Sequence, residues 1–184
     1  SLPFLNEYVY RLANTRVSRL QGRNQRMAFW INAYNALTVY AVLKLLPKSR
    51  KKQRTFSVTK VKKFWDNYFF RIDRHWRSLN YIEHKVLRPV FRDPRVHFAI
   101  VCASRGCPHL VRWPYTARRL QRQLSKVTRR YLGSPRAFQW SRSKKEVSLS
   151  KIFRWFKQDF STKPYGSVLG FVARYVPKKQ GSFI

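Results

Sequence analysis

Acidic side chains are scarce in this sequence. Seven Asp and Glu stand against 40 Lys and Arg, which gives a formal net charge of +33 over 184 residues. The excess is even, because residues 1–92 carry 20 basic and 4 acidic side chains and residues 93–184 carry 20 and 3. A dedicated nucleic-acid reader concentrates its charge on one stripe or tail. We therefore expect a basic surface all round, which binds anionic polymers or lipid surfaces non-specifically at low salt.

The scarcity of carboxylates makes each one more informative. Asp66, Glu83, Asp93 and Asp159 all adjoin aromatic or helix-end positions. Because the chain has so few acidic residues, each of them is less often an exposed surface residue without a role than in an ordinary protein. They are candidates for buried or functional roles.

The chain has only two cysteines, Cys102 and Cys107, which do not indicate a disulfide framework. A single bridge between them requires the loop to fold back, and the sequence leaves this open. No apolar run approaches the roughly 18 residues of a membrane span, so we expect no transmembrane segment. A signal-peptide pattern is absent at the visible start, but processing would erase one. The compartment stays undetermined, with the periplasm or extracellular space favoured if a signal peptide has been removed.

Several motifs are missing. The phosphate loop, the dinucleotide glycine fingerprint and the Gly-x-Ser-x-Gly elbow do not occur. His97, Cys102 and Cys107 are five residues apart, a spacing that matches no strong zinc pattern. We therefore predict neither a cofactor nor a metal site.

Hydrophobic residues make up 44% of the chain and aromatics 16%, which is too much for a disordered protein. The length fits one domain over residues 1–184. We predict a helix-rich α+β fold in which a small β-sheet around a strand at 96–102 packs against a central buried helix at 25–46. Apolar periodicity and turn residues predict further helices at 3–13, 79–87, 117–132 and 166–175, and hairpins within 68–79 and 137–149.

The stretch from 93 to 110 points to a site, because loops that leave a buried strand often hold the chemistry of α/β scaffolds. Cys107 lies in that loop, and the neighbouring Arg105 and Arg112 would favour its thiolate form. The alternative is a buried thiol that packs as a small hydrophobe. For Cys102, inside the predicted strand, we favour core packing.

His97 is expected on the strand face opposite Cys102, where it is either a base directed at the loop or a satisfied half-buried histidine. Glu83 lies on the apolar stripe of its predicted helix, and an unpaired buried carboxylate is costly. It either meets a basic partner such as Arg88 or Arg95, or serves in proton transfer. His84 points about 100° away from it.

Asn32, Tyr34 and Asn35 occur in the long helix, which has little polar surface. Buried amides require hydrogen bonds. These side chains therefore fix the backbone of a loop or line a cleft.

Six ordered segments carry a family resemblance, at residues 25–38, 78–84, 87–89, 93–99, 102–108 and 149–160. Together they resemble the family catalogued as domain of unknown function 547, over about residues 5–175. The resemblance implies no assigned function; members occur in bacteria, where many appear exported, and in plants behind a coiled-coil segment. The positions that match the family's motifs are Asn32, Asn35, Glu83, His84, His97, Cys102, Ser104 and Cys107. The family is not generally this basic, which favours a charged layer over an ordinary fold.

The leading hypothesis is a thiol-dependent hydrolase or acyl-transferase that acts on an amide or thioester. Cys107 is the predicted nucleophile, His97 or His84 the base and Glu83 the orienting group or acid. A carbonyl would be polarised by Asn32 or Asn35. The remaining predicted binding residues are Tyr34, Arg95, Ser104 and Arg105.

Whether the protein is an enzyme stays open at this stage. The alternatives are a non-catalytic domain that binds a small molecule or peptide, a basic protein whose affinity is electrostatic, and a redox role for the cysteine pair.

Overall fold

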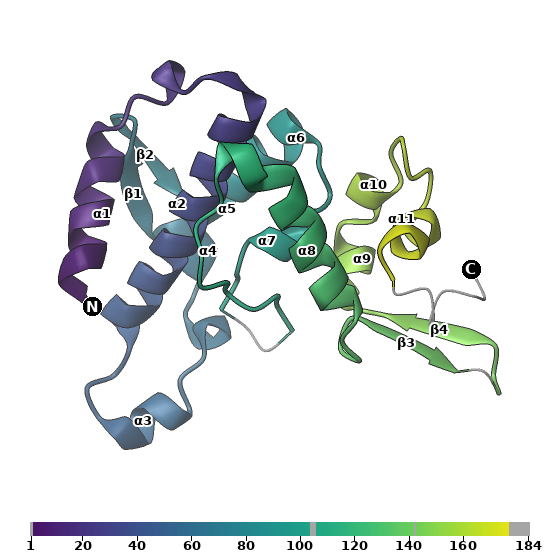
Figure 1. Cartoon of the computed structure of the whole chain (residues 1–184). Helices are drawn as coiled ribbons and strands as arrows, with labels where there is room; N and C mark the ends of the chain where they lie inside the picture. Colours follow the sequence, from purple (N-terminus) through teal and green to yellow (C-terminus); the bar gives the residue numbers. More distant parts are fainter. Residues whose placement is uncertain (1, 104–105, 142, 177–184) are drawn as a thin grey trace.

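The computed structural model describes residues 2–103, 106–141 and 143–176 (Figure 1). Its centre is the long helix α2, Gly22–Leu45. Ile31, Tyr34 and Leu37 of this helix are fully buried. Pro47 follows two residues after its end and cannot continue the helix. The predicted central buried helix is confirmed, with its start three residues earlier.

The first hairpin and the first helix lie together on one side of α2 (Figure 1). Strands β1, Phe69–Ile72, and β2, His75–Ser78, pair antiparallel, and β1 packs against α1, Leu2–Asn14. Side-chain alternation directs Phe70 and Ile72 of β1 into the core. The other short elements before this hairpin are η1 Val17–Arg19, α3 Arg50–Arg54, η2 Val58–Lys60 and α4 Phe64–Asn67.

A continuous helix with a π-helical centre follows β2. It consists of α5 Leu79–Tyr81, the π-helical η3 Ile82–Leu87 and α6 Arg88–Phe91. Ser78 caps its start by accepting a hydrogen bond from the backbone N–H of Tyr81. The η3 stretch packs against α2 and carries both Glu83 and His84. Single π-helical turns inside helices occur often at functional sites.

The C-terminal half packs around a cluster of phenylalanines. Phe98, Phe153 and Phe171 surround Phe160, with ring centroids 5.8, 4.8 and 4.9 Å from that of Phe160. The cluster joins four helices, and Figure 1 shows α9, α10 and α11 on the side of the molecule away from α1. The elements of this half are α7 Val96–Ala99, η4 Ala117–Arg119, α8 Leu120–Leu132, β3 Phe138–Ser141, β4 Glu146–Leu149, α9 Lys151–Trp155, α10 Lys157–Phe160 and α11 Val168–Tyr175.

The helix-rich α+β class is confirmed, and so are the predicted hairpins, the second of which is β3 paired with β4. The strand predicted over 96–102 is wrong, because residues 96–99 form helix α7. In the turn that precedes this helix, the side chain of Asp93 accepts a hydrogen bond from the N–H of Arg95, and the ring of Pro94 restricts its backbone to torsions that a first turn allows. The described residues therefore contain no sheet at 96–102; the paired strands are the two hairpins.

Along the described ranges, none of the helices combines the length and the apolar character needed to cross a lipid bilayer.

Candidate functional site

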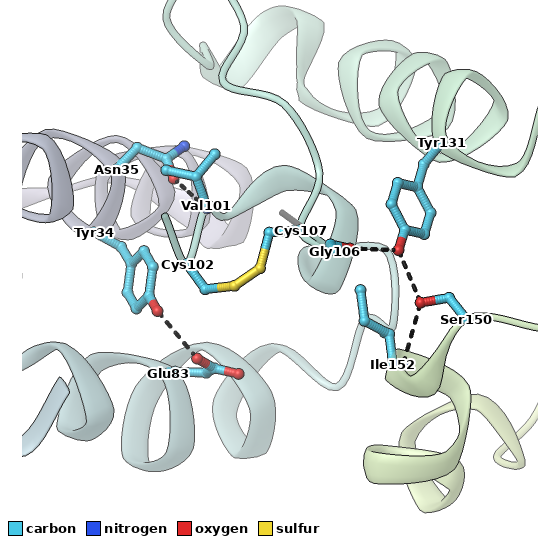
Figure 2. The surroundings of a disulfide bond; sticks show 10 residues. All are labelled: Tyr34, Asn35, Glu83, Val101, Cys102, Gly106, Cys107, Tyr131, Ser150 and Ile152. Carbon is cyan, nitrogen blue, oxygen red and sulfur yellow. Dashed lines mark hydrogen bonds between the residues drawn. A yellow bond between two sulfur atoms is a disulfide. The ribbon is translucent and has the colours of Figure 1, made fainter. Parts of the chain in front are cut away.

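Cys102 and Cys107 are joined by a disulfide, with their Cα atoms 6.0 Å apart (Figure 2). Both cysteines are half-buried. The bridge that the sequence left open is therefore present. The expectation that Cys102 packs as a core residue is wrong, because its side chain is only half-buried and forms a disulfide with Cys107. Ser104 and Arg105, two of the predicted binding residues, lie outside the described residues.

Two amides of α2 hold the segment that contains the disulfide. Asn35 donates to the carbonyl oxygen of Ala99 and accepts from the N–H of Val101, both at 2.9 Å. One helical turn earlier, Asn32 makes the same pair of bonds with the backbone of Tyr115, at 2.8 and 2.9 Å. The prediction that these amides fix a loop's backbone is confirmed. Since both ends of each amide are engaged, we do not assign either one to a substrate carbonyl.

A third attachment comes from α8. The hydroxyl of Tyr131 donates to the carbonyl oxygen of Gly106 at 3.0 Å and lies 2.9 Å from the hydroxyl of Ser150, which caps α9 (Figure 2). Burial raises the pKa of Tyr131, although its hydrogen bond with Ser150 opposes this. The phenol therefore stays protonated. The disulfide loop is thus tied to α2, α8 and α9.

A cavity of about 400 Å³ lies beside the disulfide, and we call it the central cavity. The predicted site residues in its lining are Tyr34, Glu83, His84, His97 and Cys107, and Cys102 also lines it. The rest of the lining is Thr59, Trp65, Asp66, Asn80, Ile100, Pro108, Ile152, Trp155 and Phe156. The fold therefore brings the four predicted catalytic residues, which are spread over 25 positions of sequence, to the lining of one cavity.

His97 is fixed from two directions. Its Nε2 lies 2.7 Å from a carboxylate oxygen of Asp159, and its ring stacks on Phe156 with the centroids 4.0 Å apart. The side chain is only 2% exposed. Since an ionised carboxylate only accepts hydrogen bonds, the network assigns a proton to Nε2. In a neutral His97, the lone pair is then on Nδ1.

Asp159 is held as an anion. Arg88 donates to its two oxygens at 2.7 and 3.1 Å, in addition to the bond from His97. Burial alone would raise the pKa of Asp159, but the hydrogen bonds from His97 and Arg88 hold that pKa well below its ordinary range. Asp159 therefore carries its charge throughout the physiological range.

Glu83 has a different environment. The hydroxyl of Tyr34 donates to it at 3.2 Å, and burial together with this carboxylate raises the pKa of Tyr34 well above its ordinary value. The predicted basic partners are wrong, since Arg88 pairs with Asp159 and Arg95 with Asp93.

His84 is neutral at physiological pH. Burial, together with the charges of Arg88 and His97, lowers its pKa, and Glu83 and Asp159 offset this only in part. Its Nδ1 lies 2.6 Å from a guanidinium nitrogen of Arg88, which can only donate. The remaining proton of His84 is therefore on Nε2, which can donate a hydrogen bond.

Arg95 does not line the central cavity. It forms a two-point ion pair with Asp93, at 2.7 and 2.9 Å, and also bonds to Gln121 and Ser125 of α8. These contacts join the start of α7 to α8. Arg95, which was predicted to bind a ligand, therefore makes contacts that stabilise the fold.

Three features of the site were not among the predicted site residues: Asp159, Phe156 and the Asp66–Asn80 pair. Asn80 donates to Asp66 at 2.7 Å, and both line the central cavity. The sequence contained a signal for the two aspartates, because the few carboxylates of this chain stand out. It contained no signal for Phe156, since a stacking partner cannot be identified before the fold is known. Within residues 2–103, 106–141 and 143–176, no three His, Cys, Asp or Glu side chains form a group that could hold a metal ion.

Comparison with known proteins gives one match. The sequence model described as "protein of unknown function, DUF547" matches residues 17–132, more than half of the chain. The matched part includes Glu83, His97 and both cysteines, whereas Asp159 and Phe156 lie beyond it. No curated protein and no solved structure matches this chain.

Proposed function

The chain belongs to the DUF547 family, and from that premise we propose that it is a thiol-dependent hydrolase or acyl-transferase. Cys107 is the nucleophile once the disulfide is reduced. The observation that supports this most is the meeting of Cys107 with His97 in the lining of one cavity, together with the Asp159 bond that orients His97. A nucleophile, a base and a group that orients the base are the parts that thiol and serine catalysis share.

His97 is the better candidate for the base. Its Nε2 is bonded to Asp159, so Nδ1 is the ring atom to which we assign the proton of the thiol. The negative charge of Asp159 would then stabilise the imidazolium that forms. His84 has no such carboxylate bond, since its described partner is Arg88.

His84 suits a second task. As a neutral ring with its proton on Nε2, it can donate to the oxygen that becomes negative during attack on a carbonyl. Glu83, held by Tyr34, is the proton acceptor for the group that attacks the acyl-enzyme. The role of His84 replaces the carbonyl polarisation that the sequence suggested for Asn32 or Asn35.

The reaction runs in two steps. A dithiol reductant opens the disulfide, Cys107 passes its proton to His97, and its sulfur attacks the carbonyl carbon. The bond to the leaving group breaks, the leaving group takes the proton from His97, and a thioester remains on Cys107. Water or another acceptor then attacks the thioester, loses a proton, and releases the acyl group and the thiol.

The test uses p-nitrophenyl acetate with protein treated with dithiothreitol. We expect a burst of about one equivalent of p-nitrophenolate from the reduced protein and none from the oxidised protein, because only a free thiolate can form the acyl-enzyme. The Cys102→Ser variant should show the burst without reductant, since its Cys107 cannot be bridged. The matched Cys107→Ser variant should show none. A burst that persists in Cys107→Ser, or fails to appear in Cys102→Ser, would overturn the assignment.

One observation favours a second candidate, a non-catalytic binding domain. The two sulfurs are bonded to each other, as in a structural bridge, and both cysteines line the cavity. In this case Cys107→Ser should lower the free energy of unfolding, because it removes the bridge, and should leave ligand binding intact. In the reduced protein, cysteine thiols that react with an alkylating agent only after unfolding would also support this second candidate.

The net charge of +33 supports an additional proposal, non-specific binding to polyanions and anionic lipid surfaces at low salt. The logarithm of the affinity for heparin or duplex DNA should then fall linearly with the logarithm of salt concentration, and the binding should show no sequence preference. The disulfide also fits the oxidising compartments outside the cytosol.

A further inference from the structure

The central cavity differs in charge from the rest of the molecule. Lys and Arg make up 40 of the 184 residues, so fifteen residues taken at random would include about three of them. The fifteen described residues that line this cavity include none. Four other cavities of the described structure each have Arg or Lys in their lining. Among the described residues, the lining of the central cavity thus lacks the Lys and Arg side chains that would hold an anionic ligand.

Two carboxylates in this cavity have only neutral partners among the described contacts. Glu83 accepts from the hydroxyl of Tyr34, and Asp66 accepts from the amide of Asn80. Each carboxylate has about four lone-pair sites, so acceptor capacity remains at both. Arg11, Arg88 and Arg95 form ion pairs with Glu7, Asp159 and Asp93, whereas Asp73 and Glu146, outside this cavity, have no described ion pair either. Two carboxylates with spare acceptor capacity at one cavity favour a ligand that donates hydrogen bonds and carries positive charge.

Aromatic faces form much of the remaining lining. Trp155 is 66% exposed although it lines the cavity, so its indole is largely uncovered when no ligand is bound. Trp65 and Phe156 line the same space. The faces of such rings attract ammonium groups, and indole does so most strongly. Aromatic faces combined with carboxylates are a chemical match for an organic cation.

We propose that the central cavity binds a primary ammonium group, so that the acyl acceptor of this enzyme is an amine. The amide-forming reaction rests on the proposed function, whereas the binding of the ammonium group does not depend on it. Asp66 and Trp155 are the residues that select the ammonium group. Glu83 removes one of its protons.

The chemistry balances as follows. The bound ammonium gives one proton to Glu83, and the resulting amine attacks the carbonyl carbon of the thioester on Cys107. The attacking nitrogen gives a second proton to His97 while the C–S bond breaks, which leaves an amide and a thiolate. His97 returns its proton to the thiolate, and Glu83 releases its proton to solvent. The net change is thioester plus ammonium to amide, thiol and one proton.

The first test measures how the acyl-enzyme divides between acceptors. Reduced protein, p-nitrophenyl acetate and n-butylamine near pH 7 should give N-butylacetamide at a rate at least tenfold above that in the Cys107→Ser protein. The neutral analogue n-butanol at the same concentration should give at least tenfold less ester than the amine gives amide. The salt concentration is kept near 0.15 M, where the Debye length of about 8 Å screens the repulsion between the protein's net charge and the amine. Equal use of both acceptors would overturn the inference.

Variants sharpen this test, because the ratio of amide to hydrolysed acetate does not depend on how fast the acyl-enzyme forms. Asp66→Asn and Trp155→Ala should each lower that ratio about tenfold. Glu146→Gln is the matched control, since it also removes one negative charge but lies outside the cavity lining. Its ratio should equal that of the unchanged protein. An effect as large in Glu146→Gln as in Asp66→Asn would show that net charge, and not the cavity, selects the amine.

A binding measurement separates this inference from the proposed function. Cys107→Ser cannot form a thioester, so n-butylammonium, n-butanol and butyrate can be titrated into it and followed by tryptophan fluorescence. Tighter binding of the ammonium, lost in Trp155→Ala, supports the ligand class even if no burst is ever seen. Tighter binding of butanol or butyrate overturns it, even if the burst is present.

Discussion

Two carboxylates near the central cavity, Asp159 and Glu83, show opposite environments. Asp159 receives three described hydrogen bonds from Arg88 and His97, and its pKa is held well below the ordinary range. Glu83 receives one described hydrogen bond, from the neutral hydroxyl of Tyr34. The difference separates a carboxylate that positions its neighbours from one that keeps acceptor capacity for a proton or a ligand.

The geometry of one helix explains why Arg88 serves Asp159 and not Glu83. His84 and Arg88 are four residues apart, so they lie on the same side of the helix, where their side chains meet at 2.6 Å. Glu83 is the residue before His84 and therefore points to a different side of this π-helical stretch. The arginine that the sequence offered as its partner is therefore directed toward α10.

Arg88→Met should produce the largest effect in this comparison. It leaves Asp159 without its guanidinium, and breaking a largely buried ion pair costs about 2–3 kcal/mol of unfolding free energy. Glu83→Gln should cost less than about 1 kcal/mol, because one neutral hydrogen bond changes. Urea unfolding measures both. The control is Arg92→Met, which removes an exposed arginine with no described ion pair and should change stability by less than about 0.5 kcal/mol. Equal losses in Arg88→Met and Glu83→Gln would remove the distinction between the carboxylates.

Asp159→Asn should change how stability depends on pH. An unfolded aspartate has a pKa of about 3.9, and the native pKa is lower, so the native state binds fewer protons between the two. The stabilisation is complete above that range and is lost as pH falls through it toward the native pKa. Urea unfolding from pH 7 to pH 2 should therefore show a steeper acid-side loss in the unchanged protein than in Asp159→Asn. Parallel curves would mean that the ion pair does not hold the carboxylate ionised.

Tyr34→Phe tests the other carboxylate. It removes the described hydrogen bond of Glu83 while the ring stays packed, so we expect a loss of about 1 kcal/mol in unfolding free energy. In the double variant with Glu83→Gln, the effect of Tyr34→Phe should shrink, because the partner has changed. Strict additivity of the two changes would indicate that the hydroxyl does not act through Glu83.

The smallest expected effect is on the titration of His84. Its pKa should lie below the ordinary value of about 6.5, and Glu83→Gln should lower it further, because the Glu83 charge favours the protonated ring. Arg88→Met should raise it by removing a nearby positive charge. NMR titration of the ring protons gives both directions. A rise in Glu83→Gln would contradict the proposed electrostatics.

The sequence located the elements with a clear period. The long buried helix, the amphipathic helix that became α8 and both hairpins were all predicted from apolar spacing and turn residues. The segment at 96–99 was not, because a short apolar run fits a buried helix as well as a strand. Asp93 and Pro94 were the available signals for a helix start.

The sequence by itself determined which residues are chemically unusual: two cysteines, few carboxylates, and amides within an apolar helix. Only the tertiary structure decided their partners, such as Asn35 with Val101, Arg88 with Asp159, and Cys102 with Cys107. The physical reason is range. Helix periods and turn propensities act over a few neighbouring residues, whereas the 71 positions between Arg88 and Asp159 are bridged only when both helices pack on the same core.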